Sequence, residues 1–175
     1  MGHRRGQLAV LLAALAGDLA IPAGASANPV LVHVTRTVTG ESSLLNLNPD
    51  HHGVDPRDTQ SLRALMRDLT TGQSISPAPE LLHFLAELAQ AFPGKTISII
   101  QGYADPTRSS SAQSHTKGRA LDLRLPDVNS ADIERFLVEH PRLLARVGCF
   151  PNATFFHVDV GRSRGIWFDA GVGRD

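Results

Sequence analysis

His115, Asp122 and His157 are the residues of this chain whose types and spacing could hold a catalytic metal ion. Zinc accepts imidazole nitrogen and carboxylate oxygen in a tetrahedral arrangement, and catalytic zinc sites combine three protein ligands with a water molecule. The residues occur in the segments Ser-His-Thr-Lys-Gly-Arg-Ala-Leu-Asp at 114–122 and Phe-His-Val-Asp at 156–159. Two histidines and one carboxylate around an open position would make the site of a metal hydrolase.

Two predicted strands would bring the aspartate and the second histidine to the same face of a sheet. Leucines alternate with polar residues over 121–125, the two-residue period of a strand, so Asp122 would point away from the core. Residues 154–160 alternate in the same way and would place His157 and Asp159 together on the polar face.

His115 would reach this face through a turn. It lies in a polar segment, and Gly118 allows the chain to turn sharply into the first of the two strands. Residue types alone leave two interpretations open, metal ligation and ordinary packing, because the pattern is looser than the zinc motif His-Glu-x-x-His.

The two segments carry a resemblance to a known group of enzymes. Ser-His-x-x-Gly-Arg-Ala-x-Asp at 114–122, followed by Phe-His-Val-Asp-x-Gly at 156–161, resembles the D-Ala-D-Ala metallopeptidase branch of the lysostaphin-type zinc peptidase superfamily. More closely, the chain resembles the secreted murein endopeptidase-like proteins of bacterial envelopes. The similarity extends upstream through residues 39–41, 65–68, 71–72 and 97–103.

The resemblance implies a site, a fold and a substrate. His115, Asp122 and His157 would bind Zn²⁺, as the matching residues do in that superfamily. The fold would be hedgehog-like, of the D-Ala-D-Ala peptidase type, and the substrate would be peptidoglycan. The resemblance does not fix which stem-peptide or cross-link bond is cut.

The chain departs from the family pattern around the last predicted zinc ligand. Relatives with peptidase activity place a carboxylate three residues before that ligand or a histidine two residues before it, and here these positions hold Thr154 and Phe155. Asp159, two residues after His157 on the same face of the predicted strand, is the available general base. It could instead hold a ligand histidine in its orientation.

A second departure concerns stabilisation of the oxyanion. Relatives carry Gly-Tyr-Arg where this chain reads Gly-Tyr-Ala at 102–104, so Ala104 replaces their arginine. Arg108 or Arg119 could supply a guanidinium from nearby, although each could equally be a surface residue. Tyr103 and Arg119 are therefore candidate substrate or oxyanion contacts.

Residues 1–27 have the composition of a cleaved export signal. Arg4 and Arg5 give a positive start, residues 8–15 are apolar, and residues 25–27 read Ala-Ser-Ala, a small-residue cleavage site. The apolar run is far shorter than the ~20 residues that span a bilayer, so no stable membrane insertion is expected after cleavage. We expect an exported protein of the periplasm or cell envelope, by the Sec or the twin-arginine route.

Composition predicts one domain without disulfides after this leader. Residues 28–175 have the length of a single domain. The chain balances 17 basic against 17 acidic residues, which gives no electrostatic case for nucleic acid or an anionic membrane as partner. Cys149 is the only cysteine, so it cannot form an internal disulfide, and we expect it to be a small buried residue. The oligomeric state stays open.

Hydrophobic periodicity predicts further helices and strands around the site. Additional strands are expected at 30–34, after a turn at 38–41, at 95–100 and at 166–168. The first expected helix carries an apolar stripe over 62–69, with Asp58 or Thr59 as its cap and Thr71-Gly72 at its end. The second runs from Pro79 to Pro93, and the third from a cap at 128–132 to His140. This order predicts an α+β domain with helices packed on one side of a small, mainly antiparallel sheet, and the site on or beside the other face.

Three functions fit these features. The first is a zinc peptidase that cuts stem peptides or cross-links of bacterial peptidoglycan, as an endopeptidase or a D,D-carboxypeptidase. The second is a non-catalytic, zinc-stabilised wall-binding domain of the same fold, which the missing base and the missing arginine favour. The third is a hydrolase of another small amide, which would keep the metal and change the substrate.

Overall fold

The computed structural model describes residues 28–49, 54–107, 113–150 and 155–169. The predicted export signal at 1–27 lies outside the described residues, as do Arg108 and Thr154.

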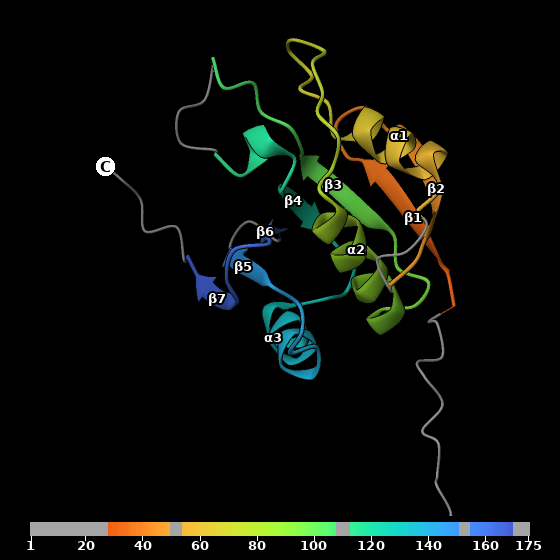
Figure 1. Ribbon diagram of the computed structural model, residues 1–175. Coiled ribbons are helices and arrows are strands. Elements are labelled where there is room, and N and C mark those ends of the chain that lie inside the picture. The colour runs from red at the N-terminus through yellow and green to blue at the C-terminus, as the bar shows by residue number, and fades with distance from the viewer. Residues whose placement is uncertain (1–27, 50–53, 108–112, 151–154, 170–175) are drawn as a thin grey trace, which may run out of the picture.

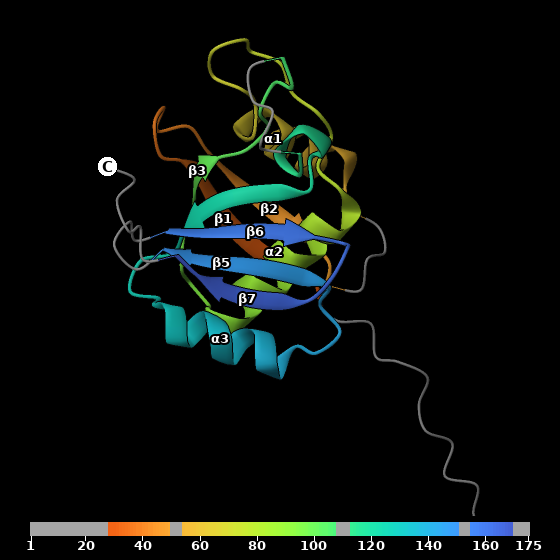
Figure 2. The same ribbon diagram turned by 90° about the vertical axis from the view of Figure 1, so that its left-hand side faces the viewer.

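One sheet of seven strands organises the molecule, in the order β2-β1-β3-β4-β6-β5-β7 (Figure 2). The strands are β1 (Val30–Arg36), β2 (Ser42–Leu47), β3 (Ile97–Gln101), β4 (Ala120–Arg124), β5 (Ala145–Phe150), β6 (Phe155–Val160) and β7 (Gly165–Phe168). The pairs β1–β3 and β5–β7 are parallel, and the other neighbours are antiparallel. The prediction of a mainly antiparallel sheet is confirmed.

The helices cover one face of this sheet (Figures 1 and 2). They are α1 (Pro56–Leu65), α2 (Pro79–Ala91) and α3 (Ser130–Glu139), and a single 3-10 turn, η1, spans His115–Lys117. The core lies between the two layers, where strand residues such as Leu121 and Val158 join helix residues such as Leu85 and Phe136 in one buried cluster. The α+β architecture with helices on one side is therefore as predicted.

Two of the helices begin where the sequence indicated. Pro79 occupies the first turn of α2. Asn129 caps α3, and a capping box with Asp132 satisfies the free backbone N–H groups at the start of that helix. α3 ends before His140, also as expected.

The first helix begins and ends earlier than predicted. Asp55, and not Asp58 or Thr59, is its cap, because Pro56 occupies the first helical position and the Asp55 side chain accepts a hydrogen bond from the N–H of Arg57 at 2.7 Å.

A turn around Asp68 ends the helical conformation before Thr71-Gly72. The Asp68 carboxylate accepts hydrogen bonds from the N–H groups of Thr70 and Thr71 at 2.8 and 3.0 Å, which competes with helical pairing. Leu69, the last position of the predicted apolar stripe, is 39% exposed as a result.

The strand β5 is not among the strands predicted from the sequence. Its residues Ala145, Val147 and Cys149 face the core, which confirms that Cys149 is buried. Arg146 and Gly148 occupy the alternate positions, and glycine is depleted in strands, so the local pattern gave a weak strand signal.

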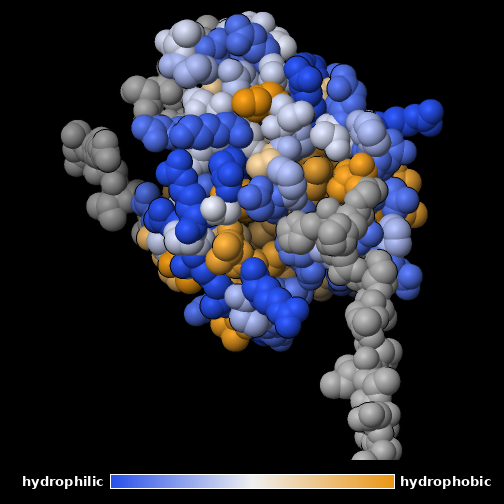
Figure 3. Space-filling model, viewed as in Figure 1, coloured by the Kyte–Doolittle hydropathy of each residue, from blue (hydrophilic) through white to orange (hydrophobic). Residues whose placement is uncertain are grey.

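Within the described ranges, no helix is long and apolar enough to cross a membrane. Figure 3 shows one face of the molecule, on which apolar residues are interspersed among polar ones.

Candidate metal centre

A tight turn delivers His115 to the sheet. Gly118 follows η1 in the left-handed conformation, with φ of 66°, and a Cβ atom there would lie 2.4 Å from the carbonyl oxygen of Ser76. Only glycine fits both constraints, which agrees with the predicted sharp turn into β4. The Gly118 carbonyl also accepts a hydrogen bond from the N–H of Ala78, so the loop before α2 supports the turn.

The pairing of β4 with β6 places Asp122 directly opposite His157. Their neighbours Leu121 and Val158 point into the core, so the two polar side chains share the face of the sheet that the helices leave uncovered. The Nδ1 atom of His157 lies 2.8 Å from Oδ1 of Asp122.

The structure brings all three predicted ligands together. Nε2 of His115 lies 3.3 Å from Nδ1 of His157 and 3.6 Å from Oδ1 of Asp122. Tetrahedral ligands at zinc bond lengths would lie about 3.3 Å apart, so these separations fit one ion with little rearrangement. Among the described residues, this is the one cluster of three or more histidine, cysteine or acidic side chains that could hold a metal.

A backbone carbonyl fixes the orientation of the buried His115 ring. Its Nδ1–H group donates a hydrogen bond to the carbonyl oxygen of Gly102 at 2.7 Å. Nε2 is then the nitrogen with a free lone pair, and it faces Asp122 and His157. Gly102 itself lies against the end of α1, where a Cβ atom would come within 2.4 Å of the carbonyl oxygen of Met66. Gly102 is not among the predicted site residues, although a glycine at the end of a strand signals a close approach of backbone.

The histidines also determine the charge of the aspartate. Burial alone would raise the pKa of Asp122, but hydrogen bonds and charge interactions with His115 and His157 outweigh it and lower the pKa to about 2. The carboxylate is therefore ionised at neutral pH, the state in which it can bind a cation.

Comparison with known proteins places the chain among cell-wall enzymes. A family model described as peptidoglycan L,D-endopeptidase MepK matches residues 24–167. The chain belongs to the MepK family. Searches of curated proteins and of solved structures each gave no match.

Asp159 lies on the same face of the sheet as Asp122 and His157, two residues after His157 on β6. Its Oδ2 accepts a hydrogen bond from the hydroxyl of Ser114 at 2.7 Å, and Ser114 directly precedes His115. Its Oδ1 is buried and has no hydrogen-bond partner within the described part of the chain. The carboxylate thus contacts the residue before His115 with one oxygen, while the other makes no hydrogen bond to the described residues.

Arg119 makes its contacts on the helical side of the sheet. Its guanidinium donates to the carbonyl of Val160 at 2.9 Å and lies 3.4 Å from the carboxylate of Glu80 in α2. These contacts direct it toward α2 and not toward Asp122.

The backbone of Tyr103 lies next to the site. It follows Gly102, and its N–H donates to the carbonyl of Met66 at 2.6 Å. Ala104, at the position of the relatives' arginine, is buried with 6% exposure. Among the described contacts, the side chain of Tyr103 makes no hydrogen bond to the triad, and the methyl group of Ala104 cannot make one.

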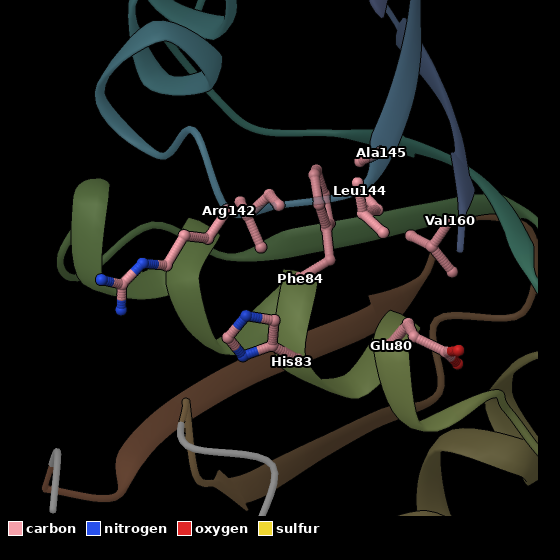
Figure 4. A pocket seen from close by; sticks show the side chains of 8 residues that line it. Glu80, His83, Phe84, Arg142, Leu144, Ala145 and Val160 are labelled. Atoms are coloured by element: carbon pink, nitrogen blue, oxygen red, sulfur yellow. The ribbon is translucent and has the colours of Figure 1, made fainter. Parts of the chain in front are cut away.

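A small pocket lies on the helical side of the sheet, between α2 and the segment that follows α3 (Figure 4). Its volume is about 100 Å³, and Glu80, Phe84 and Val160 contribute to its lining. Because Val160 points to the face opposite His157, the sheet separates this pocket from the triad.

Proposed function

We propose that this chain is a zinc-dependent peptidase that cleaves an L,D amide bond in peptidoglycan cross-links. The observation that carries the proposal is the convergence of His115, Asp122 and His157 in a chain of the MepK family. A donor set of two imidazoles and one carboxylate is suited to zinc and leaves a position for water. The fold would be of the hedgehog-like, D-Ala-D-Ala peptidase type.

The three side chains would hold the metal through Nε2 of His115, Nδ1 of His157 and Oδ1 of Asp122. When bound, zinc supplies a Lewis acid that polarises the scissile carbonyl and lowers the pKa of a bound water. The hydrogen bond from His115 to Gly102 would keep the ligand nitrogen directed at the ion throughout.

Asp159 is the proposed proton acceptor, through its unpartnered Oδ1. Its bond to Ser114 also gives it a positioning role for His115, and substitutions can separate the two. Asp159→Asn retains an oxygen that accepts from Ser114 but abolishes the base, whereas Ser114→Ala removes the hydrogen bond and retains the carboxylate.

If Asp159 is the base, the asparagine variant will bind zinc normally and lose about 10²-fold or more in turnover, while Ser114→Ala will remain active. Normal turnover in the asparagine variant together with weaker zinc binding in Ser114→Ala would leave Asp159 with the positioning role alone. Zinc content by atomic absorption and muropeptide release by chromatography give the two measurements.

The second candidate function is a zinc-stabilised wall-binding domain without catalysis. The residues Phe155 and Ala104, where relatives carry catalytic groups, favour it. Retention on isolated sacculi without any product, unchanged in Asp159→Ala, would select this function over the peptidase. A hydrolase of another small amide would instead act on D-amino-acid dipeptides and spare sacculi.

The proposed location follows from the same substrate. Peptidoglycan lies outside the cytoplasmic membrane, so residues 1–27 would serve as an export signal and residues 28–175 would form the single mature domain. Detection of a processed chain in the envelope fraction, with its new N-terminus at residue 28, tests this assignment.

The deciding experiment measures zinc content and muropeptide release together for three proteins. These are the wild type, His157→Ala, and the control His33→Ala, whose exposed imidazole on β1 forms a hydrogen bond with Thr96. We expect stoichiometric zinc and metal-dependent loss of cross-linked dimers in the wild type and the control, and neither in His157→Ala. Stoichiometric zinc without product from any type of sacculus would refute the peptidase.

A further inference from the structure

The register of the sheet continues the row that contains Asp122 and His157 as far as the edge strand β7. Asp122 on β4 faces His157 on β6, His157 faces Gly148 on β5, and Gly148 faces Trp167 on β7. All four positions therefore lie side by side across the uncovered face of the sheet.

The Trp167 ring lies beside the site because Gly148 has no side chain that would displace it. A Cβ atom at Gly148 would lie 2.4 Å from Cζ2 of the indole, so the ring lies over the bare backbone of β5. This brings the indole to 5.7 Å from the His157 ring, measured between centroids. Any larger residue at 148 would displace the tryptophan from the metal ligand.

Arg146 occupies the next row on the same face, opposite Asp159. Its guanidinium carbon lies 5.2 Å from the centroid of the Trp167 ring, within the range of a cation–π contact. Arg146 is exposed, and no acidic side chain of the described ranges forms an ion pair with it. The result is a positive charge that an aromatic ring holds next to the triad, without a salt bridge to any described acidic side chain.

The scissile bond of the proposed substrate offers a matching anion. The amide nitrogen of an L,D bond is attached to a D-configured carbon, and in a cross-link through a diamino acid that carbon also carries a free carboxylate. Neighbouring residues on one face of a strand are about 7 Å apart, a distance that an arginine side chain can bridge. Arginine is also the side chain best suited to a planar carboxylate.

We propose that Arg146 and Trp167 form a specificity subsite, in which Arg146 binds the free carboxylate beside the scissile amide and Trp167 packs against the adjoining aliphatic chain. This inference rests on the proposed function, since it names the part of the cross-link that the same site recognises. Trp167 additionally restricts the guanidinium to the site, so the two residues act together.

The test compares two defined cross-linked muropeptide dimers that differ only at this carbon, one with a carboxylate and one with a carboxamide. The full-length protein is assayed for cleavage when loaded with zinc, and for binding by calorimetry without added metal. Arg146→Gln removes the charge, and Arg142→Gln makes the same change at an exposed arginine on the helical side of the sheet. Zinc content is measured for each protein.

We expect the wild type and Arg142→Gln to favour the carboxylate dimer by about tenfold in kcat/KM and in Kd. Arg146→Gln should lose this preference while its zinc content stays unchanged. Trp167→Leu should weaken the preference in the same direction.

Equal kcat/KM and Kd of the wild type for the two dimers, or an unchanged preference in Arg146→Gln, would contradict the proposed subsite. Neither result would contradict the proposed peptidase activity. Failure to cleave either dimer with a retained Arg146-dependent preference in binding would overturn the peptidase alone. Absence of binding to both dimers would contradict the subsite directly.

Discussion

Asp122 is the residue on which the charge of the candidate site depends. It lies between the two histidines, and their hydrogen bonds lower its pKa to about 2 from an ordinary value of 3.8. Because the folded-state pKa is the lower one, the stability that Asp122 contributes is complete above its ordinary pKa and is lost as the pH falls through about 2. The same electrostatics that would attract a cation therefore make the metal-free protein sensitive to acid.

Asp122→Asn is expected to remove this acid-sensitive part of the stability, about 2 kcal/mol. The measurement is urea unfolding of the metal-free protein at about pH 6 and about pH 2. Asp127→Asn is the matched control, because the Asp127 side chain is exposed and pairs with Lys95. If both variants lose stability with acid as steeply as the wild type does, the Asp122 carboxylate is not the group responsible.

At the scale of elements, the site depends on the contact between the end of α1 and the end of β3. Gly102 permits this contact, and its carbonyl accepts a hydrogen bond from Nδ1 of His115. The packing of a helix is thereby coupled to the orientation of a proposed metal ligand.

Gly102→Ala is expected to destabilise the fold by about 3 kcal/mol and to weaken zinc binding about tenfold, because the added methyl group would meet the carbonyl of Met66. Urea unfolding and competition with a chromophoric chelator measure the two effects. Gly165→Ala serves as the control, since a Cβ atom there meets nothing within 4 Å. Unaltered zinc affinity in an unstable Gly102→Ala protein would separate the packing from the site.

The α3 helix gives a prediction about stability alone. Asn129→Ala removes the side chain that accepts hydrogen bonds from the N–H groups of Ala131 and Asp132, at 2.9 and 3.1 Å. We expect a loss of about 1 kcal/mol in the free energy of unfolding, with zinc content unchanged because α3 lies on the face opposite the triad. A loss of zinc in this variant would contradict the separation of the two faces.

At the scale of the whole molecule, a bound metal would join three elements of the chain, of which the last lies 35 residues beyond Asp122. His115 belongs to η1, Asp122 to β4 and His157 to β6. A ligand that binds only the folded state stabilises it by mass action, so the metal would tie the turn of η1 to the sheet.

Removal of the metal with EDTA is expected to lower the thermal midpoint by roughly 5–10 °C, and added zinc should restore it. Scanning fluorimetry or calorimetry measures the shift. His157→Ala lacks one ligand and should show no response to EDTA. An identical midpoint for the wild type with and without EDTA would mean that no tightly bound metal stabilises the fold.

The sequence determined the local features that position the ligands. Alternation in β4 and β6 decides which side chains leave the core, so the sequence alone predicts Asp122 and His157 on the polar faces of their strands. The turn at Gly118 and the cap of α3 at Asn129 were likewise predictable, because each depends on a few adjacent residues.

Only the tertiary structure decided which distant residues complete the site. The bond of Ser114 to Asp159, the contact of His115 with Gly102 and the position of Trp167 over Gly148 all join separate elements. Local periodicity carries no information about strand register or about which helix end meets which strand. The direction of Arg119 toward Glu80 has the same origin, since it was settled by packing against α2 and not by the sequence around it.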